Sequence, residues 1–384
     1  MRLLVLLLLG GCVATADSRP ETDSGTGTVD SGAVDTGTSP DPDAGVVPGV
    51  DAEVGFDAGP GDPPPPVGTD PRDSATVYWV GHSLSSARDA LHPSSRTLFE
   101  LVGDFASAAG QSYDFHRHTT PGAPLSWNWN EESAKRAEIE TRGGRYDVMI
   151  MTEGISLAES IRWHNTAFYA QRFYCAMNNA NPASEVYLYE SWHHLYGSDP
   201  EQRYPEPHVF DWRARLDEDR PRWESIIDDA MRADLPPPSD MPYYDGGRCT
   251  PSRQMRLIPA GTAIAALVDA LETNAPVWEG LTRHGLVQNG YRNWPSEWPV
   301  APGTPVDWRA RMSTLETIHP GVLDDIHPNR TLIYFVALVH YSTVYRRSPI
   351  GLPALNGVSP SLARAMQELV WNVVTRDPRT GVTG

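Results

Sequence analysis

The sequence predicts an α/β protein, a three-layer α/β/α sandwich built on a mainly parallel sheet of five strands. Short apolar, β-branched runs recur along the chain with helical stretches between them, which is typical of the crossover units of a parallel sheet. The run at 147–151 is apolar without alternation, as expected for a central strand that is covered on both faces. No second proline-rich linker interrupts residues 74–384, so we expect one large core there.

The expected elements follow in chain order. The strands are expected at 76–80, 112–118, 147–151, 185–189 and 255–258. A helix should follow the first strand, with Ser94 or Ser95 as its N-cap. Its apolar face would carry Leu98, Leu101, Val102 and Phe105. Further helices are expected near 330–345 and 361–374. Ligands of such sheets bind beyond the carboxyl ends of the strands, so the residues there are the functional candidates.

The first residues predict export. Arg2 precedes a short leucine-rich run that ends at Gly10-Gly11-Cys12, and this run is too short to span a membrane. Residues 9–12 resemble the bacterial lipobox, which implies that 1–12 is a signal peptide and that Cys12 is lipidated. Val13 then favours the outer membrane over the inner one. The alternative is ordinary signal cleavage with an incidental cysteine.

Residues 13–73 have the composition of a disordered acidic tether, because Asp, Gly, Thr, Ser and Pro dominate and little apolar surface can be buried. The segment holds 2 Arg against 13 Asp+Glu, which gives 2 − 13 = −11 of the chain's net charge of −18. The remaining domain, 74–384, is expected to fold without it. Loose binding of divalent cations by the tether is an alternative. This acidity argues against a nucleic-acid partner.

Two cysteines remain beyond Cys12. Cys175 and Cys249 are compatible with one disulfide in an exported chain, and two buried free thiols remain the alternative.

Two segments carry candidate chemistry. Gly81-His82-Ser83-Leu84 follows the first expected strand and places a serine hydroxyl at the carboxyl edge of the sheet. Asp324-Asp325-Ile326-His327-Pro328-Asn329 directly precedes a helix. A carboxylate three residues before a histidine can hold one imidazole nitrogen and leave the other to take a proton from a serine. A loop serine and an ordinary helix-entry turn are the alternatives.

Together these segments resemble the SGNH, or GDSL-like, hydrolase family over residues 76–345. The family has a nucleophilic serine after its first strand and D-x-x-H-P before its last helix, and His82 replaces the usual Asp or Asn of the serine block. The resemblance implies a flavodoxin-like fold, a Ser83-His327-Asp324 triad, and Gly122 as an oxyanion donor with the Ser83 amide. No metal or organic cofactor is required.

After the third expected strand, the family normally has a G-x-N-D block. This chain departs from that pattern, since 151–156 contains no asparagine. One branch of the family has a Q-E pair there and an E-T-W motif after the fourth strand, and Thr152-Glu153 with Glu190-Ser191-Trp192 looks similar. Loss of catalysis is the alternative. Glu153 would orient the loop or the substrate, and the Thr152 hydroxyl or the Gly154 amide would supply a third oxyanion donor.

Histidines and tryptophans also gather near strand ends. His116, His118, His193 and His194 could hold a metal, although local hydrogen bonding is the preferred interpretation because no further ligand cluster completes a set. His82 could act as base, but its side chain should point away from Ser83, so His327 is preferred.

The chain contains 12 tryptophans, and several follow candidate site residues. Trp127 and Trp192 could bind sugar rings or an acyl group, as could Trp129, Trp294, Trp298 and Trp308; packing of long loops is the alternative. We therefore expect a monomeric serine esterase that removes O-acyl or O-acetyl groups from carbohydrate and contacts membrane only through Cys12. A glycan-binding module without catalysis and a lipase or phospholipase are the alternatives.

Overall fold

The computed structural model describes residues 70–89, 92–130, 133–194, 212–236, 249–288 and 326–383. The predictions for Cys12, for the tether up to residue 69, for Asp324 and Asp325, and for the three tryptophans between 294 and 308 lie outside these residues. Within them, no helix combines the length and apolar character needed to cross a membrane.

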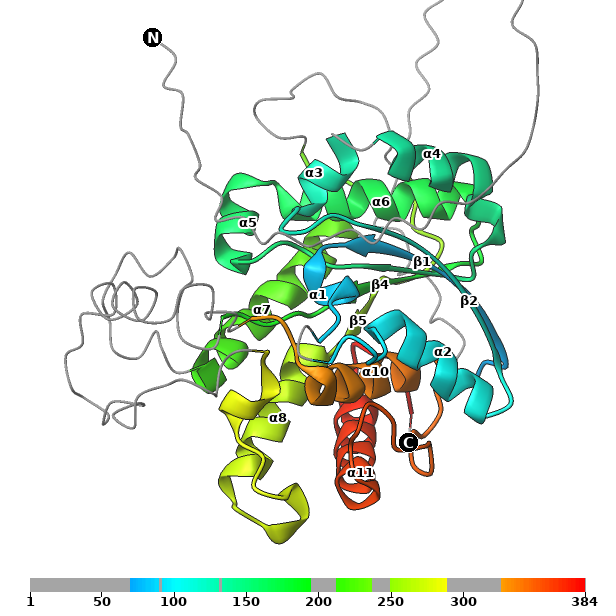
Figure 1. Cartoon of the computed structure of the whole chain (residues 1–384). Helices are drawn as coiled ribbons and strands as arrows, with labels where there is room; N and C mark the ends of the chain where they lie inside the picture. Colours follow the sequence, from blue (N-terminus) through cyan, green and yellow to red (C-terminus); the bar gives the residue numbers. More distant parts are fainter. Residues whose placement is uncertain are drawn as a thin grey trace, which may run out of the picture. The chain divides into compact units, whose positions relative to one another are not determined.

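The sheet has five parallel strands in the order β2-β1-β3-β4-β5 (Figure 1). Their bounds are β1 Ser74–Gly81, β2 Ser112–Thr119, β3 Val148–Met151, β4 Glu185–Tyr189 and β5 Arg256–Ile258. All five expected strands are confirmed, and so is the predicted parallel sheet. This order is the flavodoxin-like one, in which the chain reverses its direction of winding between β1 and β3 and leaves a crevice at their carboxyl ends.

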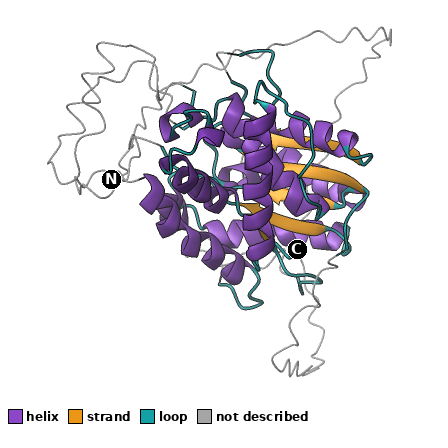
Figure 2. Ribbon diagram, turned by 90° about the horizontal axis from the view of Figure 1, so that it is seen from below, coloured by secondary structure: helices purple, strands orange, loops and turns teal. Residues whose placement is uncertain are grey.

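Helices cover both faces of the sheet, which confirms the predicted three-layer α/β/α sandwich (Figures 1 and 2). The helices are α1 Ser83–Ser86, α2 Leu98–Ala108, α3 Leu125–Asn130, α4 Ser133–Arg142, α5 Leu157–Trp163, α6 Thr166–Ala180, α7 Trp212–Ala230, α8 Ala260–Glu272, α10 Arg330–Tyr345 and α11 Pro360–Arg376. Helices α2, α8, α10 and α11 pack on one face, and α3 to α6 pack on the other. The two faces enclose separate apolar cores, with β3 buried between them.

The start of α2 differs from the prediction. Thr97 is the N-cap, so the assignment of this cap to Ser94 or Ser95 is wrong. The Thr97 side chain accepts a hydrogen bond from the Glu100 amide, and the Glu100 carboxylate accepts one from the Thr97 amide. This reciprocal pair satisfies two helix-end donors at once, which a lone serine further upstream would not do. The predicted apolar face of the helix is buried.

Cys175 and Cys249 form a disulfide with a Cα–Cα distance of 5.4 Å. The bond joins α6 to the segment that leads into β5. The sequence left open one disulfide or two buried free thiols, and the structure has the disulfide.

Residues 70–73, which precede the predicted boundary at Ser74, make contacts with the domain. The Arg72 guanidinium lies 2.7 Å from the buried Glu185 carboxylate. The Arg72 amide donates to the Tyr345 carbonyl at 3.0 Å, and Arg346 donates to the Asp70 carbonyl at 3.0 Å. Residues 70–73 thus pair with the amino end of β4 and the carboxyl end of α10.

We expect a chain beginning at Asp70 to be more stable than one beginning at Ser74. Loss of Arg72 removes a charged hydrogen-bond partner from a buried carboxylate, which costs about 2 kcal/mol. Urea unfolding of the two truncated chains measures the difference. Equal midpoints and slopes would show that residues 70–73 contribute nothing to the fold.

Candidate active site

Ser83 lies at the carboxyl end of β1, where it is the first residue of α1 and is half-buried. The preceding Gly81 allows β1 to approach the end of β3. A Cβ atom at Gly81 would lie only 2.7 Å from Cγ2 of Thr152, closer than real Cβ contacts come. The strand end therefore requires glycine, and Ser83 follows it at the edge of the sheet where β1 and β3 end.

The structure assigns both ring nitrogens of His82 to structural hydrogen bonds. Its Nε2 lies 2.7 Å from the Glu153 carbonyl, and its Nδ1 accepts from the Leu84 amide at 3.4 Å. Burial lowers the pKa of His82 to about 4, against the effect of the Glu153 carbonyl, and the charge of His327 lowers it further. His82 is thus a neutral cap of α1 at pH 7. Neither of its nitrogens is directed at Ser83.

His327 lies in the turn that leads into α10 and is half-buried. Its carbonyl accepts from the Gln288 amide at 2.9 Å, and the next residue, Pro328, forms an antiparallel bridge with Val287. The Trp192 indole donates to the carbonyl of Ile326 at 2.9 Å. The turn is therefore held on both sides of His327, and its backbone position is defined.

Two hydrogen bonds join the turn to the segment after Ser83. The Arg330 amide donates to Asp89 Oδ2 at 3.0 Å, and Gln288 Nε2 donates to the Arg88 carbonyl at 2.8 Å. These contacts hold the segment after Ser83 and the turn of His327 at the same edge of the sheet. Asp324, the predicted third member, lies outside the described residues.

Gly122 lies in an exposed loop between β2 and α3, with φ +69°. The loop begins beside the end of β1, where the Thr120 amide donates to the Gly81 carbonyl at 2.9 Å. The buried Asn128 side chain donates to the Pro124 carbonyl at 3.2 Å and to the Gly81 carbonyl at 3.4 Å. Asn128 therefore ties the Gly122 loop to the strand that presents Ser83. Sequence reasoning missed this residue, because an asparagine on a short helix carries no motif.

The three candidates after β3 are engaged within the protein. The Thr152 hydroxyl donates to the Tyr189 carbonyl at 2.9 Å. The Gly154 amide donates to Glu153 Oε1 at 2.6 Å, and the Leu125 amide donates to the same oxygen at 3.0 Å. Glu153 thus fastens the end of β3 to the start of α3, the loop-orienting alternative of the sequence analysis. Neither Thr152 nor Gly154 directs its donor at a substrate in this arrangement.

Glu153 also predicts how stability depends on pH. Burial raises the pKa of its carboxyl from 4.5 to about 7, although the amides of Gly154 and Leu125 favour the charged form. The folded state therefore holds a proton that the unfolded state releases, so this contribution to stability falls as pH rises from about 4.5 through 7. At 1.36 kcal/mol per unit, the shift corresponds to roughly 3 kcal/mol.

We expect Glu153→Gln to match the wild type at pH 4, below the pKa of the unfolded state, and to be more stable by roughly 3 kcal/mol at pH 8. Glutamine keeps the carbonyl acceptor but never carries the charge. Urea unfolding at both pH values measures the change. Glu190, another buried carboxyl, is present in both proteins, so its contribution to the pH dependence cancels in the comparison. Parallel pH profiles would contradict the assignment.

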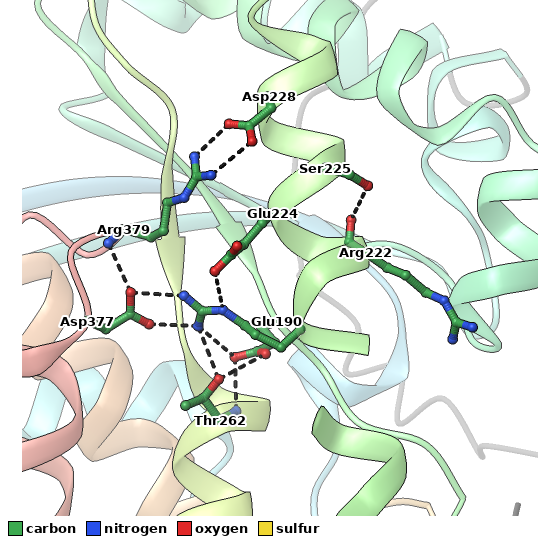
Figure 3. A network of polar contacts seen from close by, with 9 residues as sticks. Glu190, Arg222, Glu224, Ser225, Asp228, Thr262, Asp377 and Arg379 are labelled. Atoms are coloured by element: carbon green, nitrogen blue, oxygen red, sulfur yellow. Dashed lines mark hydrogen bonds and ion pairs between the residues drawn. The ribbon is translucent and has the colours of Figure 1, made fainter. Parts of the chain in front are cut away.

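Glu190 belongs to a polar network between the end of β4 and its neighbours (Figure 3). Its two carboxylate oxygens accept from the amide of Thr262 at 2.9 Å and from the hydroxyl of Thr262 at 3.1 Å. Arg220 bridges Glu190, at 3.7 Å, and Asp377, at 2.6 Å. Burial raises the pKa of Glu190 to about 7. The acidic residue of the E-S-W segment therefore fastens β4 to α7, α8 and the chain after α11.

The two predicted tryptophan contacts differ in exposure. Trp192 is 1% exposed and holds the His327 turn, so its ring packs in the core rather than at a surface. Trp127 is 49% exposed on α3, five residues after Gly122. Only Trp127 of this pair offers a ring to a ligand in this conformation.

The histidines near the strand ends make local contacts. His116 packs on Tyr146 and His118 packs on Tyr78, with ring centroids 5.6 Å and 5.8 Å apart. His193 pairs with Asp219. Among the residues that the structure describes, no three histidines, cysteines or carboxylates are grouped to hold a metal ion.

No family model and no curated protein matches the chain. Among solved structures, a DUF4886 family protein from Bacteroides uniformis is similar, at 14% identity and a TM-score of 0.41, over 79% of this chain and 95% of that one. A putative SGNH hydrolase from Slackia heliotrinireducens is 13% identical, with a TM-score of 0.36 over 71% and 99%. An acetyl-xylooligosaccharide esterase from Geobacillus is 8% identical, with a TM-score of 0.36 over 71% and 93%. In its sequence motifs, the chain resembles the SGNH hydrolases. Its sheet order is the flavodoxin-like one.

Proposed function

We propose that the protein is a serine hydrolase of ester bonds, with Ser83 as nucleophile and His327 as general base. The observation that carries the proposal is the joining of the segment after Ser83 to the turn of His327 by the bonds from Arg330 to Asp89 and from Gln288 to Arg88. Two segments more than 200 residues apart along the chain are thereby joined beyond the carboxyl ends of the strands, which is where such sheets bind ligands.

The chemistry follows the two steps of acyl transfer. His327 takes the proton of the Ser83 hydroxyl as its oxygen attacks the ester carbonyl, and the alcohol leaves with that proton. Water then attacks the acyl-serine, again with His327 as base, and releases the acid. The amides of Ser83 and Gly122 would stabilise the oxyanion, and one such donor is worth about 3 kcal/mol of barrier. Asp324 is proposed to orient His327.

The substrate is proposed to be an O-acyl or O-acetyl ester on carbohydrate. Trp127 supports this choice, because an exposed indole on the helix that follows Gly122 can stack on a sugar ring while the acyl group is at Ser83. Lipidation of Cys12 would hold the enzyme at the cell envelope, where such polysaccharides are met.

Titration with an active-site phosphonate tests the function directly. We expect one label per chain on Ser83, and hydrolysis of acetylated oligosaccharides in preference to long-chain acyl esters. Trp127→Ala should raise KM for the oligosaccharides about fivefold, the equivalent of about 1 kcal/mol of ring contact, and leave kcat nearly unchanged. Trp163→Ala, which removes another exposed indole on α5, is the matched control.

A glycan-binding module without catalysis is the second candidate, favoured by one observation. The Thr152 hydroxyl and the Gly154 amide, the predicted third donors, are both engaged inside the protein. Absence of phosphonate labelling together with binding of oligosaccharides that depends on Trp127 would select this alternative. Preference for long acyl chains would instead select a lipase.

A further inference from the structure

The pattern D-x-x-H-P occurs twice in the chain. Besides residues 324–328, it is present at Asp89-Ala90-Leu91-His92-Pro93, directly after α1. Its aspartate is 2% exposed, and its Oδ2 lies 3.0 Å from His92 Nδ1. Its spacing is the same as that of the proposed catalytic segment, but its residues are not among the predicted site residues.

The first copy completes the start of α10. The Asn329 side chain accepts from the amides of Thr331 and Leu332, at 3.0 Å and 3.1 Å. The Arg330 amide is left without a partner inside the helix, as the first amides of a helix always are. Asp89 Oδ2 accepts from this amide at 3.0 Å. A carboxylate is stabilised there, because the amino end of a 16-residue helix carries partial positive charge.

Gln288 makes a second connection between the same two segments. Its side-chain Nε2 donates to the Arg88 carbonyl at 2.8 Å and to the Pro328 carbonyl at 3.2 Å. Its backbone amide donates to the His327 carbonyl at 2.9 Å. The residue is 9% exposed, so these bonds form out of water.

The two connections join the segments that directly follow the two proposed catalytic residues in the chain. Asp89 lies six residues after Ser83, and Arg330 lies three residues after His327. A shift of α1 relative to the His327 turn would have to break the bonds of both Asp89 and Gln288. A misplacement of about 1 Å can lower a catalytic rate about 100-fold, so such a connection bears on the reaction itself.

We propose that Asp89 and Gln288 are positioning residues that set the His327 imidazole against the Ser83 hydroxyl. Asp89 acts through the Arg330 amide, and Gln288 acts through the Arg88 and Pro328 carbonyls. His92 is an outer partner of Asp89 and takes no part in the alignment. The proposal rests on the proposed esterase function, and names two residues that its motifs do not include.

The kinetic test uses Asp89→Ala, Gln288→Glu and the conservative Asp89→Asn. Glutamate keeps the size of Gln288 but cannot donate to two carbonyls, whereas asparagine can still accept from the Arg330 amide. We expect Asp89→Ala and Gln288→Glu each to lower kcat about 10- to 100-fold with KM changed less than about twofold. Asp89→Asn should restore kcat to within about threefold of wild type. A purely structural role would lower the unfolding midpoint and leave kcat of the folded protein unchanged, which would overturn the proposal.

Two matched controls and one second measurement complete the design. Asp104→Asn removes a surface partner of Arg96, and His92→Asn removes the outer partner of Asp89; both should keep wild-type kcat. The imidazole signals of His327 in nitrogen-proton NMR spectra, assigned with His327→Gln, should shift in Gln288→Glu and Asp89→Ala but not in the controls. If the wild type neither hydrolyses esters nor takes the phosphonate, the proposed function fails and the NMR result alone decides the positioning role. Unchanged His327 signals would overturn it.

Discussion

Ser83→Ala is expected to lower kcat for ester hydrolysis by at least about 10⁴-fold while the fold stays intact. Removal of the nucleophile in a serine hydrolase costs about 10⁶-fold, because binding and the oxyanion donors alone leave only a small residual rate. The fold should persist because Ser83 is half-buried and His82, rather than Ser83, caps α1.

Steady-state kinetics and phosphonate labelling measure this effect, with circular dichroism to confirm folding. Ser86→Ala is the matched control, since Ser86 is a half-buried serine at the other end of the same short helix. A folded Ser83→Ala protein that keeps most of its activity would refute the nucleophile assignment.

Asp324→Asn is expected to lower kcat about 10³- to 10⁴-fold, whereas Asp325→Asn should change it less than about twofold. An aspartate that accepts from one imidazole nitrogen holds the tautomer that leaves the other nitrogen free to accept a proton. Asparagine disturbs that tautomer and removes the support for the imidazolium. The three-residue spacing of Asp324 from His327 is the family's spacing, and Asp325 is one residue too close.

Kinetics on the two variants, each checked for folding, decide between the carboxylates. The reverse ranking would transfer the orienting role to Asp325. Small and equal effects would mean that His327 acts without an aspartate from this segment, or that it is not the base.

The sequence alone determined the five strands, the helix at 330–345 and the apolar face of α2. These features arise from the spacing of apolar residues within about a dozen positions. That spacing indicates a helix or a strand without knowledge of what packs against it. The cap of α2 was also available locally, since Thr97 and Glu100 have the spacing of a capping box; the prediction chose a serine upstream of it.

The tertiary structure alone decided what the polar residues at the strand ends do. Glu153 and Glu190 had the sequence pattern of site residues, but their carboxylates accept hydrogen bonds from backbone amides of other elements. The Trp192 indole donates a hydrogen bond to the Ile326 carbonyl, 134 residues away along the chain. The Asp89 carboxylate accepts one from the Arg330 amide, 241 residues away. A sequence pattern records which groups can form hydrogen bonds. Their partners are set by how the layers pack, because a buried polar group must take the partner that the neighbouring element brings within reach.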